Sequence, residues 1–374
     1  MASPLRLAWF VSPHGFGHAA RSTAIIEALG RGSPAIEVEL WTSVPDWFFA
    51  ESLTVPYRYR GLRCDVGLVQ RSPVEEDLPA SLAALESFWR AADGGGIAET
   101  AAELAAAGAA CVVADIAPFG LEVARAAGLP GILIENFTWD WIYEPLAAVE
   151  PRFGDWADLL RLKSAGADLH LQLEPCCRPV AGAHAVPPVA RAPRRSGEEV
   201  RARLAVPAGD AFVLISLGGV EHRLANLAPL ASRRGMTFVV PGGSREERWQ
   251  GNLRLLPHHS PIHHPDLVAA ADVVVGKLGY STVAETVAAG GRMLYVPRPG
   301  FRESAVLERY VGERLPARAM TGAELESGAW VEHLAALLGQ PRPAPLAGAG
   351  ALTGAGFAAG LIAEWLAAGR RRRR

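Results

Sequence analysis

Short apolar runs recur along the whole chain, and a turn and a longer stretch of mixed apolar and polar residues separate each run from the next. In the first half the runs cover residues 5–11, 38–42, 56–59, 111–115, 131–135 and 169–173. In the second half they cover residues 211–217, 237–241, 253–256, 273–275 and 291–296. Runs this short and this rich in branched residues are typical of buried strands, and the stretches between them have the length of helices. The alternation predicts an α/β protein with parallel sheets and right-handed crossovers.

A stretch dense in proline and arginine, residues 174–209, separates the two series. Such a composition is typical of a linker, and 374 residues are enough for two domains of roughly 100–200 residues each. We therefore expect two doubly wound parallel-sheet (Rossmann-like) domains that face each other across a cleft. The expected boundaries are residues 1–180 for an amino-terminal domain, 181–209 for the linker, 210–345 for a carboxyl-terminal domain and 346–374 for a final helix with an arginine tail.

Residues 271–311 hold a strand, a turn, a helix, a second strand and another helix in immediate succession. The start of a helix carries unpaired N–H groups and roughly half a positive charge, which suits a phosphate. Gly279 lets the main chain approach a ligand closely, and Ser281 and Thr282 add hydroxyl groups. This segment is therefore predicted to hold the nucleotide half of a binding site.

A structural explanation of the same turn stays open. Thr282 and Glu285 have the spacing of a capping box, in which the threonine caps the helix and the glutamate returns to the cap's N–H. On spacing alone the capping box and the nucleotide site explain the turn equally well. Arg298, Arg302 and Glu303 follow the next strand, at the edge where open α/β sheets bind ligands, and they favour the nucleotide site.

The first turn of the chain has a glycine pattern of its own. Gly15, Gly17 and Ala20 fit the G-x-G-x-x-A pattern of dinucleotide-binding folds. That pattern also requires an acid at the end of the second strand, whereas Glu37 and Glu39 lie at its start or in its interior. An NAD-dependent oxidoreductase is therefore a lesser alternative.

Two histidines, His14 and His18, lie in the same turn. A histidine in such a turn is expected to be exposed to substrate, and an ordinary pKa near neutrality suits a general base. His18 is the stronger candidate, with a structural role as the alternative. Asp115 ends another strand at the same edge, and it either orients the imidazole, as in triad-like arrangements, or caps the following helix.

No metal site is predicted. His258, His259, His263 and His264 occur in one loop, but no group of carboxylates accompanies them. The four cysteines are too few and too poorly spaced for a zinc site or a disulfide framework.

Four aromatic residues follow the strand at residues 131–135, namely Phe137, Trp139, Trp141 and Tyr143. They could line a pocket for an acceptor, or they could be the core of the next helix. Core packing is favoured, because aromatic side chains dominate protein interiors.

Composition excludes some classes of function. Half of the residues are hydrophobic and 20% are charged, as in a compact globular protein. The net charge is −2, and the terminal arginine run, residues 370–374, is the only basic cluster, so no nucleic-acid partner is expected. Ser12, Pro13 and His14 interrupt the first apolar run, which is therefore a strand and not a signal peptide. A cytoplasmic protein is expected.

Residues 344–369 carry Glu364 as their only charge. We expect a terminal helix that packs on the rest of the protein, with contact to an anionic membrane surface as a lesser possibility. Its apolar face is expected to consist of Phe357, Leu361, Ile362, Trp365 and Leu366.

These motifs resemble those of the GT-B glycosyltransferases. The stretch His-Gly-Phe-Gly-His-Ala-Ala-Arg-Ser, residues 14–22, is similar to the first loop of the peptidoglycan UDP-N-acetylglucosamine transferase. Gly-Tyr-Ser-Thr-Val-Ala-Glu, residues 279–285, is similar to the start of the donor-binding helix in that enzyme and in plant UDP-glycosyltransferases. A closer resemblance, over about residues 5–338, is to the glycosyltransferase-like amino-terminal domain of plant L-arabinokinases and its bacterial stand-alone relatives. The stretches shared with that domain are residues 14–22, 136–143 and 275–285.

The resemblance implies an inverting, metal-independent transfer of a sugar from a nucleoside diphosphate sugar, with UDP as the favoured nucleotide, to an acceptor hydroxyl. No cofactor is implied. His18 would be the base, with Asp115 and His14 beside it. Glu285 would bind the donor ribose, and Glu303 would lie near the sugar. The complete set of donor-binding residues that it implies is Gly17, Gly218, Gly219, Lys277, Gly279, Tyr280, Ser281, Thr282, Glu285, Arg302 and Glu303.

One residue departs from the pattern of plant UDP-glycosyltransferases. Lys277 stands two residues before Gly279, where those enzymes carry a histidine. The kinase half of the plant arabinokinases has no counterpart in this sequence, so sugar kinase activity is not implied. A non-catalytic protein that binds sugar nucleotides is the main alternative to a transferase.

Overall fold

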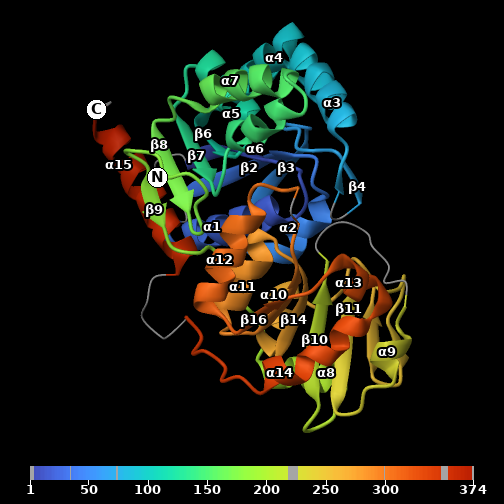
Figure 1. Ribbon diagram of the computed structural model, residues 1–374. Coiled ribbons are helices and arrows are strands. Elements are labelled where there is room, and N and C mark those ends of the chain that lie inside the picture. Colours follow the sequence, from blue (N-terminus) through green and yellow to red (C-terminus); the bar gives the residue numbers. More distant parts are fainter. Residues whose placement is uncertain are drawn as a thin grey trace. The chain divides into compact units, whose positions relative to one another are not determined.

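The computed structural model describes residues 4–33, 35–72, 75–217, 226–298, 300–346 and 353–372. The chain divides into two compact units, Met1–Val189 with Leu352–Arg374, and Ala190–Ala351. Each unit is built on one seven-stranded sheet with helices on both faces (Figure 1). The two doubly wound sheets predicted from the sequence are therefore confirmed.

In the first unit the strand order is β3-β2-β1-β6-β7-β8-β9, and all neighbouring strands are parallel. The strands are β1 (Leu5–Val11), β2 (Ile36–Thr42), β3 (Tyr57–Gly61), β6 (Ala109–Asp115), β7 (Gly131–Glu135), β8 (Leu169–Leu173) and β9 (His184–Val186). A small separate hairpin joins β4 (Gln70–Ser72) and β5 (Glu75–Glu76). The chain order reverses between β1 and β6, so this unit has its topological switch point there.

One strand lies where a linker is expected. His184 of β9 pairs with Leu171 of β8, inside the proline-rich stretch between the two series. A strand of three residues is too short to show a periodicity, so the composition of the stretch concealed it.

Three helices cover one face of this sheet, namely α1 (Gly17–Gly32), α2 (Asp46–Ser52) and α15 (Gly354–Arg372). The predicted packing of the terminal helix is confirmed, since Ile362 is fully buried against this core. The predicted face is partly wrong, because Phe357 is 36% exposed. Small residues bring α15 close to α1, and the buried hydrophobic positions of α15 are Ala355, Ala358, Ala359, Ile362 and Leu366.

The remaining helices of the unit are α3 (Leu78–Ala91), α4 (Ile97–Ala107), α5 (Pro118–Ala126), α6 (Trp139–Tyr143) and α7 (Arg152–Ser164). A π-helical turn, Ala92–Gly96, separates α3 from α4, and Gly95 there has a φ of 141°, which only glycine adopts readily. A 3-10 turn, Glu144–Ala148, joins α6 to α7. All four aromatic residues at 137–143 are less than 9% exposed, which confirms the prediction that they are core.

In the second unit the strand order is β12-β13-β11-β10-β14-β15-β16, with the edge strand β12 antiparallel to β13 and the other pairs parallel. The strands are β10 (Ala211–Ser216), β11 (Met236–Pro241), β12 (Arg248–Gln250), β13 (Leu253–Leu256), β14 (Val273–Lys277), β15 (Met293–Val296) and β16 (Ala317–Ala319). The order reverses between β10 and β14. Gly276 of β14 allows the close pairing of these two strands, since a Cβ there would overlap the carbonyl oxygen of Ser216.

The helices of this unit are α8 (Gly197–Arg203), α9 (Ala228–Ala231), α10 (His264–Ala270), α11 (Tyr280–Ala288), α12 (Ser304–Arg314), α13 (Gly322–Ser327) and α14 (Leu334–Leu338), with a 3-10 turn at Ala329–His333. Buried Trp330 anchors the face covered by the last two helices. The helix α8 also lies within the expected linker, where a capping box of Ser196 and Glu199 starts it. Among the described helices, none combines the length and the apolar character that a bilayer crossing requires.

Candidate functional site

The switch point of the first sheet brings His18 and Asp115 together. Asp115 is the last residue of β6, and His18 is the second residue of the helix α1 that follows β1. The imidazole Nδ1 lies 3.2 Å from Asp115 Oδ1. The alternative in which Asp115 caps the following helix is wrong, because the N-cap of α5 is Ala117 and no side chain caps it.

The environment of His18 differs from the sequence-based expectation. His18 belongs to the helix α1, and it is only 6% exposed. The prediction that this histidine is exposed is therefore wrong. Burial and the positive charge of Arg21 lower the pKa of His18, and the hydrogen bond to Asp115 opposes this. The imidazole is therefore neutral near pH 7.

A buried arginine completes the cluster. Arg21 Nε lies 2.9 Å from each carboxylate oxygen of Asp115, and its other nitrogens donate to Asp115 and to Asn136. Ser22 Oγ donates to Asp115 Oδ2 over 2.6 Å. Burial alone would raise the pKa of Asp115, but Arg21 and His18 hold it below its usual value. The sequence analysis missed Arg21, because a single arginine in a helix carries no signal of a partner 94 residues away.

His14 lies beside this cluster and packs on aromatic residues. Its ring meets the edge of Trp139 with the centroids 5.2 Å apart, and a side chain at Gly67 would overlap both rings. Trp139 Nε1 donates to Asp65 over 2.7 Å. Burial raises the pKa of Asp65 to about 7. The sequence analysis also missed Asp65, which lies in a segment without regular structure.

In the second unit, the turn after β14 opens onto α11 as predicted. Gly279 is the N-cap, so Tyr280, Ser281 and Thr282 form the first turn of the helix, where N–H groups have no acceptor within the helix. The capping-box explanation is wrong, because no side chain caps this helix. Gly218 and Gly219, expected on the same diphosphate, lie outside the described residues.

Glu285 is buried under this turn and already paired. Its Oε1 accepts from Arg191 Nε over 2.9 Å, and its Oε2 lies 3.2 Å from His264 Nδ1. His264 Nε2 in turn lies 3.0 Å from Ser216 Oγ, at the end of β10. Burial would raise the pKa of Glu285, but Arg191 and His264 lower it to about 2. Its role on a ribose stays a prediction, and the network of Arg191, His264 and Ser216 was not anticipated.

A second charged cluster follows β14 and β15. Arg298 donates to Glu303 Oε1 over 3.1 Å and to the carbonyl of Leu278 over 3.3 Å. Burial raises the pKa of Glu303, and burial and Arg298 together lower the pKa of Lys277 to about 8. Within the described residues, Arg298 Nε and Glu303 Oε2 are buried without a hydrogen-bond partner. Arg302, like Tyr280, is half-buried.

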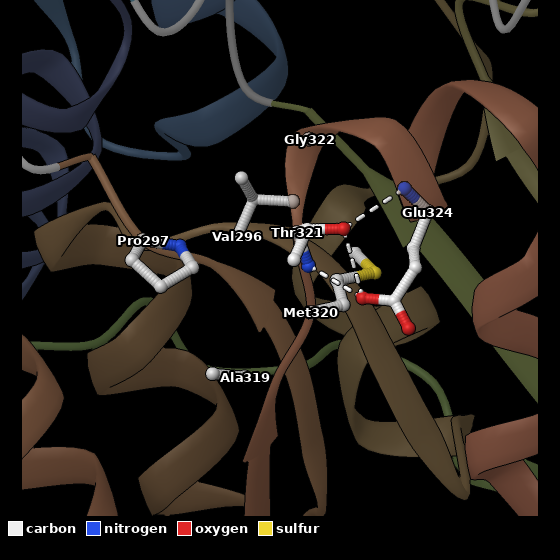
Figure 2. A pocket seen from close by; sticks show the side chains of 7 residues that line it. All are labelled: Val296, Pro297, Ala319, Met320, Thr321, Gly322 and Glu324. Carbon is white, nitrogen blue, oxygen red and sulfur yellow. Dashed lines mark hydrogen bonds between the residues drawn. The ribbon is translucent and has the colours of Figure 1, made fainter.

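Each unit holds a cavity. One of about 320 Å³ lies past the ends of β15 and β16, in front of the Thr321–Glu324 capping box (Figure 2). Its lining consists of Val296, Pro297, Ala319, Met320, Thr321, Gly322 and Glu324. The other, of about 430 Å³, lies in the first unit between β8, α7 and the loop before β9. In the part of the chain that the structure describes, no group of three or more histidine, cysteine or acidic side chains is placed to hold a metal ion.

Two Rossmann-like units in one chain make up the GT-B fold. The solved structures that resemble the chain have this fold. UGT89C1 of Arabidopsis thaliana complexed with UDP has a TM-score of 0.64 at 14% identity, over 97% of this chain and 99% of that one. A UDP-glucosyltransferase of Polygonum tinctorium capable of glucosylating indoxyl has a TM-score of 0.63 at 16% identity, over 98% and 99% of the two chains.

Among curated proteins, the L-arabinokinase of Arabidopsis thaliana is 28% identical over 339 residues, which make up 88% of this chain. The chain spans about a third of the length of that relative, 32%. No protein-family model matches the sequence.

Proposed function

We propose that the protein transfers a sugar from a nucleoside diphosphate sugar, with UDP as the nucleotide, to an acceptor hydroxyl, with inversion and without a metal ion or cofactor. The observation that carries the proposal is the hydrogen-bonded pair of His18 and Asp115 at the switch point of a GT-B fold. The named UDP complex among the similar structures supports a UDP-linked donor.

In the proposed reaction His18 is the base. Because an ionised carboxylate can only accept, the bond to Asp115 fixes the proton of the neutral imidazole on Nδ1 and leaves the lone pair on Nε2. The acceptor O–H gives its proton to Nε2 as its oxygen bonds to the anomeric carbon. The bond between that carbon and the diphosphate oxygen breaks on the opposite face, and its electron pair leaves with the nucleoside diphosphate.

The second unit would hold the donor. The N-terminus of α11 would direct the N–H groups of its first turn at a diphosphate. Lys277 adds a cation, and its pKa of about 8 leaves it mostly charged at pH 7. Both stabilise the negative charge that develops on the leaving group, which is the task of a metal ion in other enzymes. The unpartnered Arg298 Nε and Glu303 Oε2 offer one donor and one acceptor, which suits a sugar hydroxyl.

Two observations favour the alternative of a protein that binds sugar nucleotides without transferring the sugar. Both oxygens of Glu285 already accept hydrogen bonds from side chains, and His18 is 6% exposed. A binding protein requires neither group to react.

Calorimetric titration of the full chain with UDP, GDP, TDP, ADP and NAD, without added metal, tests the donor half. Selective micromolar binding of UDP is expected. Hydrolysis of the bound UDP-sugar then separates enzyme from binding protein, and His18→Gln should abolish turnover and keep UDP affinity. His170→Gln is the control, since His170 forms a partly buried pair with Glu135, in which Nε2 lies 2.9 Å from Oε1. Turnover that survives in His18→Gln would remove the base from the mechanism.

A further inference from the structure

Asp115 accepts hydrogen bonds from two nitrogen-bearing side chains, the Arg21 guanidinium and the His18 imidazole. Its side chain is fully buried, and Arg21 Nε contacts both of its oxygens at 2.9 Å, with a further Arg21 nitrogen donating to Oδ1. The imidazole of His18 lies on the same Oδ1 at a longer distance, 3.2 Å. In a two-member pair of histidine and aspartate, the carboxylate stabilises the charged imidazole. Here the guanidinium is the closer partner, and it donates to both carboxylate oxygens, whereas the imidazole contacts one.

The guanidinium is held rigidly in this position. Arg21 is 3% exposed, one of its nitrogens donates to Asn136 Oδ1, and Asn136 is itself fixed by donation to the carbonyls of Leu173 and Pro175 over 2.8 and 3.2 Å. The hydrogen bonds thus join α1 to the ends of β6, β7 and β8. This network holds the Arg21 guanidinium in a single position beside Asp115.

We propose that Arg21 is a positioning residue for His18: it keeps Asp115 ionised, so that the imidazole proton stays on Nδ1, and it opposes protonation of Nε2. The base then remains in its reactive, neutral form under mildly acidic conditions. This inference rests on the proposed function, because it assigns Arg21 a role only through His18.

The other described groups around the pair carry no positive charge. Asp65, in the segment that crosses the ends of β1 and β2, is a buried carboxyl with a pKa raised to about 7, so it is largely protonated below that pH. Ser22 donates a neutral hydrogen bond to Asp115, and the ring of Phe137 after β7 faces the imidazole with its centroid 6.0 Å away. Of the described groups that act on His18, Arg21 is the cation.

The experiment is a histidine titration by NMR on the full chain, with the His18 signal assigned by its loss in His18→Gln. The wild type is expected to show a His18 midpoint below the ordinary value of 6.5. Arg21→Met should move the midpoint of the His18 titration upward by a unit or more, which is a tenfold change in proton affinity, and Arg21→Lys should restore most of the wild-type midpoint. Arg254→Met is the control, because Arg254 is another buried arginine, with its hydrogen bonds to carbonyls of the second unit.

Two results would overturn the proposal. One is a wild-type His18 midpoint at or above 6.5, which requires no variant to fold. The other is an unchanged midpoint in Arg21→Met, with a loss of melting temperature equal to that of Arg254→Met, since this marks Arg21 as structural. Neither measurement uses a sugar nucleotide. If the protein shows no transferase activity but His18 has a low titration midpoint, the proposed function is contradicted and this role of Arg21 is not.

Discussion

Replacing Glu285 by glutamine separates the two roles that its carboxylate could have, as a ribose ligand and as an ion-pair partner. Its oxygens meet Arg191 Nε at 2.9 Å and His264 Nδ1 at 3.2 Å. Glutamine keeps the shape of the side chain and removes its charge. Arg191, whose side chain is 10% exposed, would then be buried without this counter-ion, which is costly.

The magnitude follows from the proton affinity of the group. Burial would raise the pKa of Glu285, but Arg191 and His264 lower it from 4.5 to about 2. One pKa unit corresponds to about 1.4 kcal/mol, so the network adds roughly 3 kcal/mol to the free energy of unfolding at neutral pH. Because the folded pKa is the lower one, this stabilisation is complete above pH 4.5 and is lost as the pH falls toward about 2.

Urea unfolding of the wild type and of Glu285→Gln at a series of pH values is the assay. The variant should be less stable by roughly 3 kcal/mol at pH 7, and the difference should shrink below pH 4.5. Glu198→Gln is the control, because Glu198 is exposed in the first turn of α8 and the loss of its charge should have a small effect. Equal unfolding free energies for wild type and Glu285→Gln at pH 7 would refute the ion-pair reasoning, and UDP titrations on the same samples report the ribose role separately.

Three further predictions concern other parts of the molecule. Gly276→Ala should destabilise the second unit by about 3 kcal/mol or more, because its Cβ would overlap the Ser216 carbonyl; a melting temperature within a degree of wild type would contradict this. Lys277→Met should weaken UDP binding about tenfold. The UDP affinity of the wild type should fall as the pH rises through about 8, because Lys277 loses its positive charge there. A UDP affinity that calorimetry finds unchanged between pH 7 and 9 would exclude a contact between Lys277 and the diphosphate. Ile362→Ala should lower the free energy of unfolding in urea by about 2–4 kcal/mol, because Ile362 is fully buried. Phe357→Ala, at an exposed position, should have little effect. Equal losses of stability in the two variants would contradict the assignment of the buried face of α15.

The elements that the sequence predicted well are those with a local signature. Residues 5–11 and 169–173 are strands with the predicted ends, because a buried strand shows itself as a continuous apolar run. The turn before α11 was found for the same reason, since Gly279 and the hydroxyl residues after it are adjacent in the chain.

The features that the sequence did not predict depend on partners far apart in the chain. Arg191 meets Glu285 across 94 residues, and no periodicity links the two. The exposure of His18 was misjudged because burial is decided by the residues packed around it, which come from other elements. Thr282 and Glu285 had the spacing of a capping box, but the helix begins two residues before Thr282, so the motif was out of register with the helix start.

The return of α15 to the first unit has a consequence for synthesis of the chain. The second unit, Ala190–Ala351, is one continuous segment inserted between two parts of the first. On the ribosome it can therefore emerge and fold in full while the first unit still lacks its last helix. Until Ala358 and Ile362 arrive, the apolar surface of α1 that they cover stays open to solvent, so the amino-terminal unit, although made first, is the one completed last.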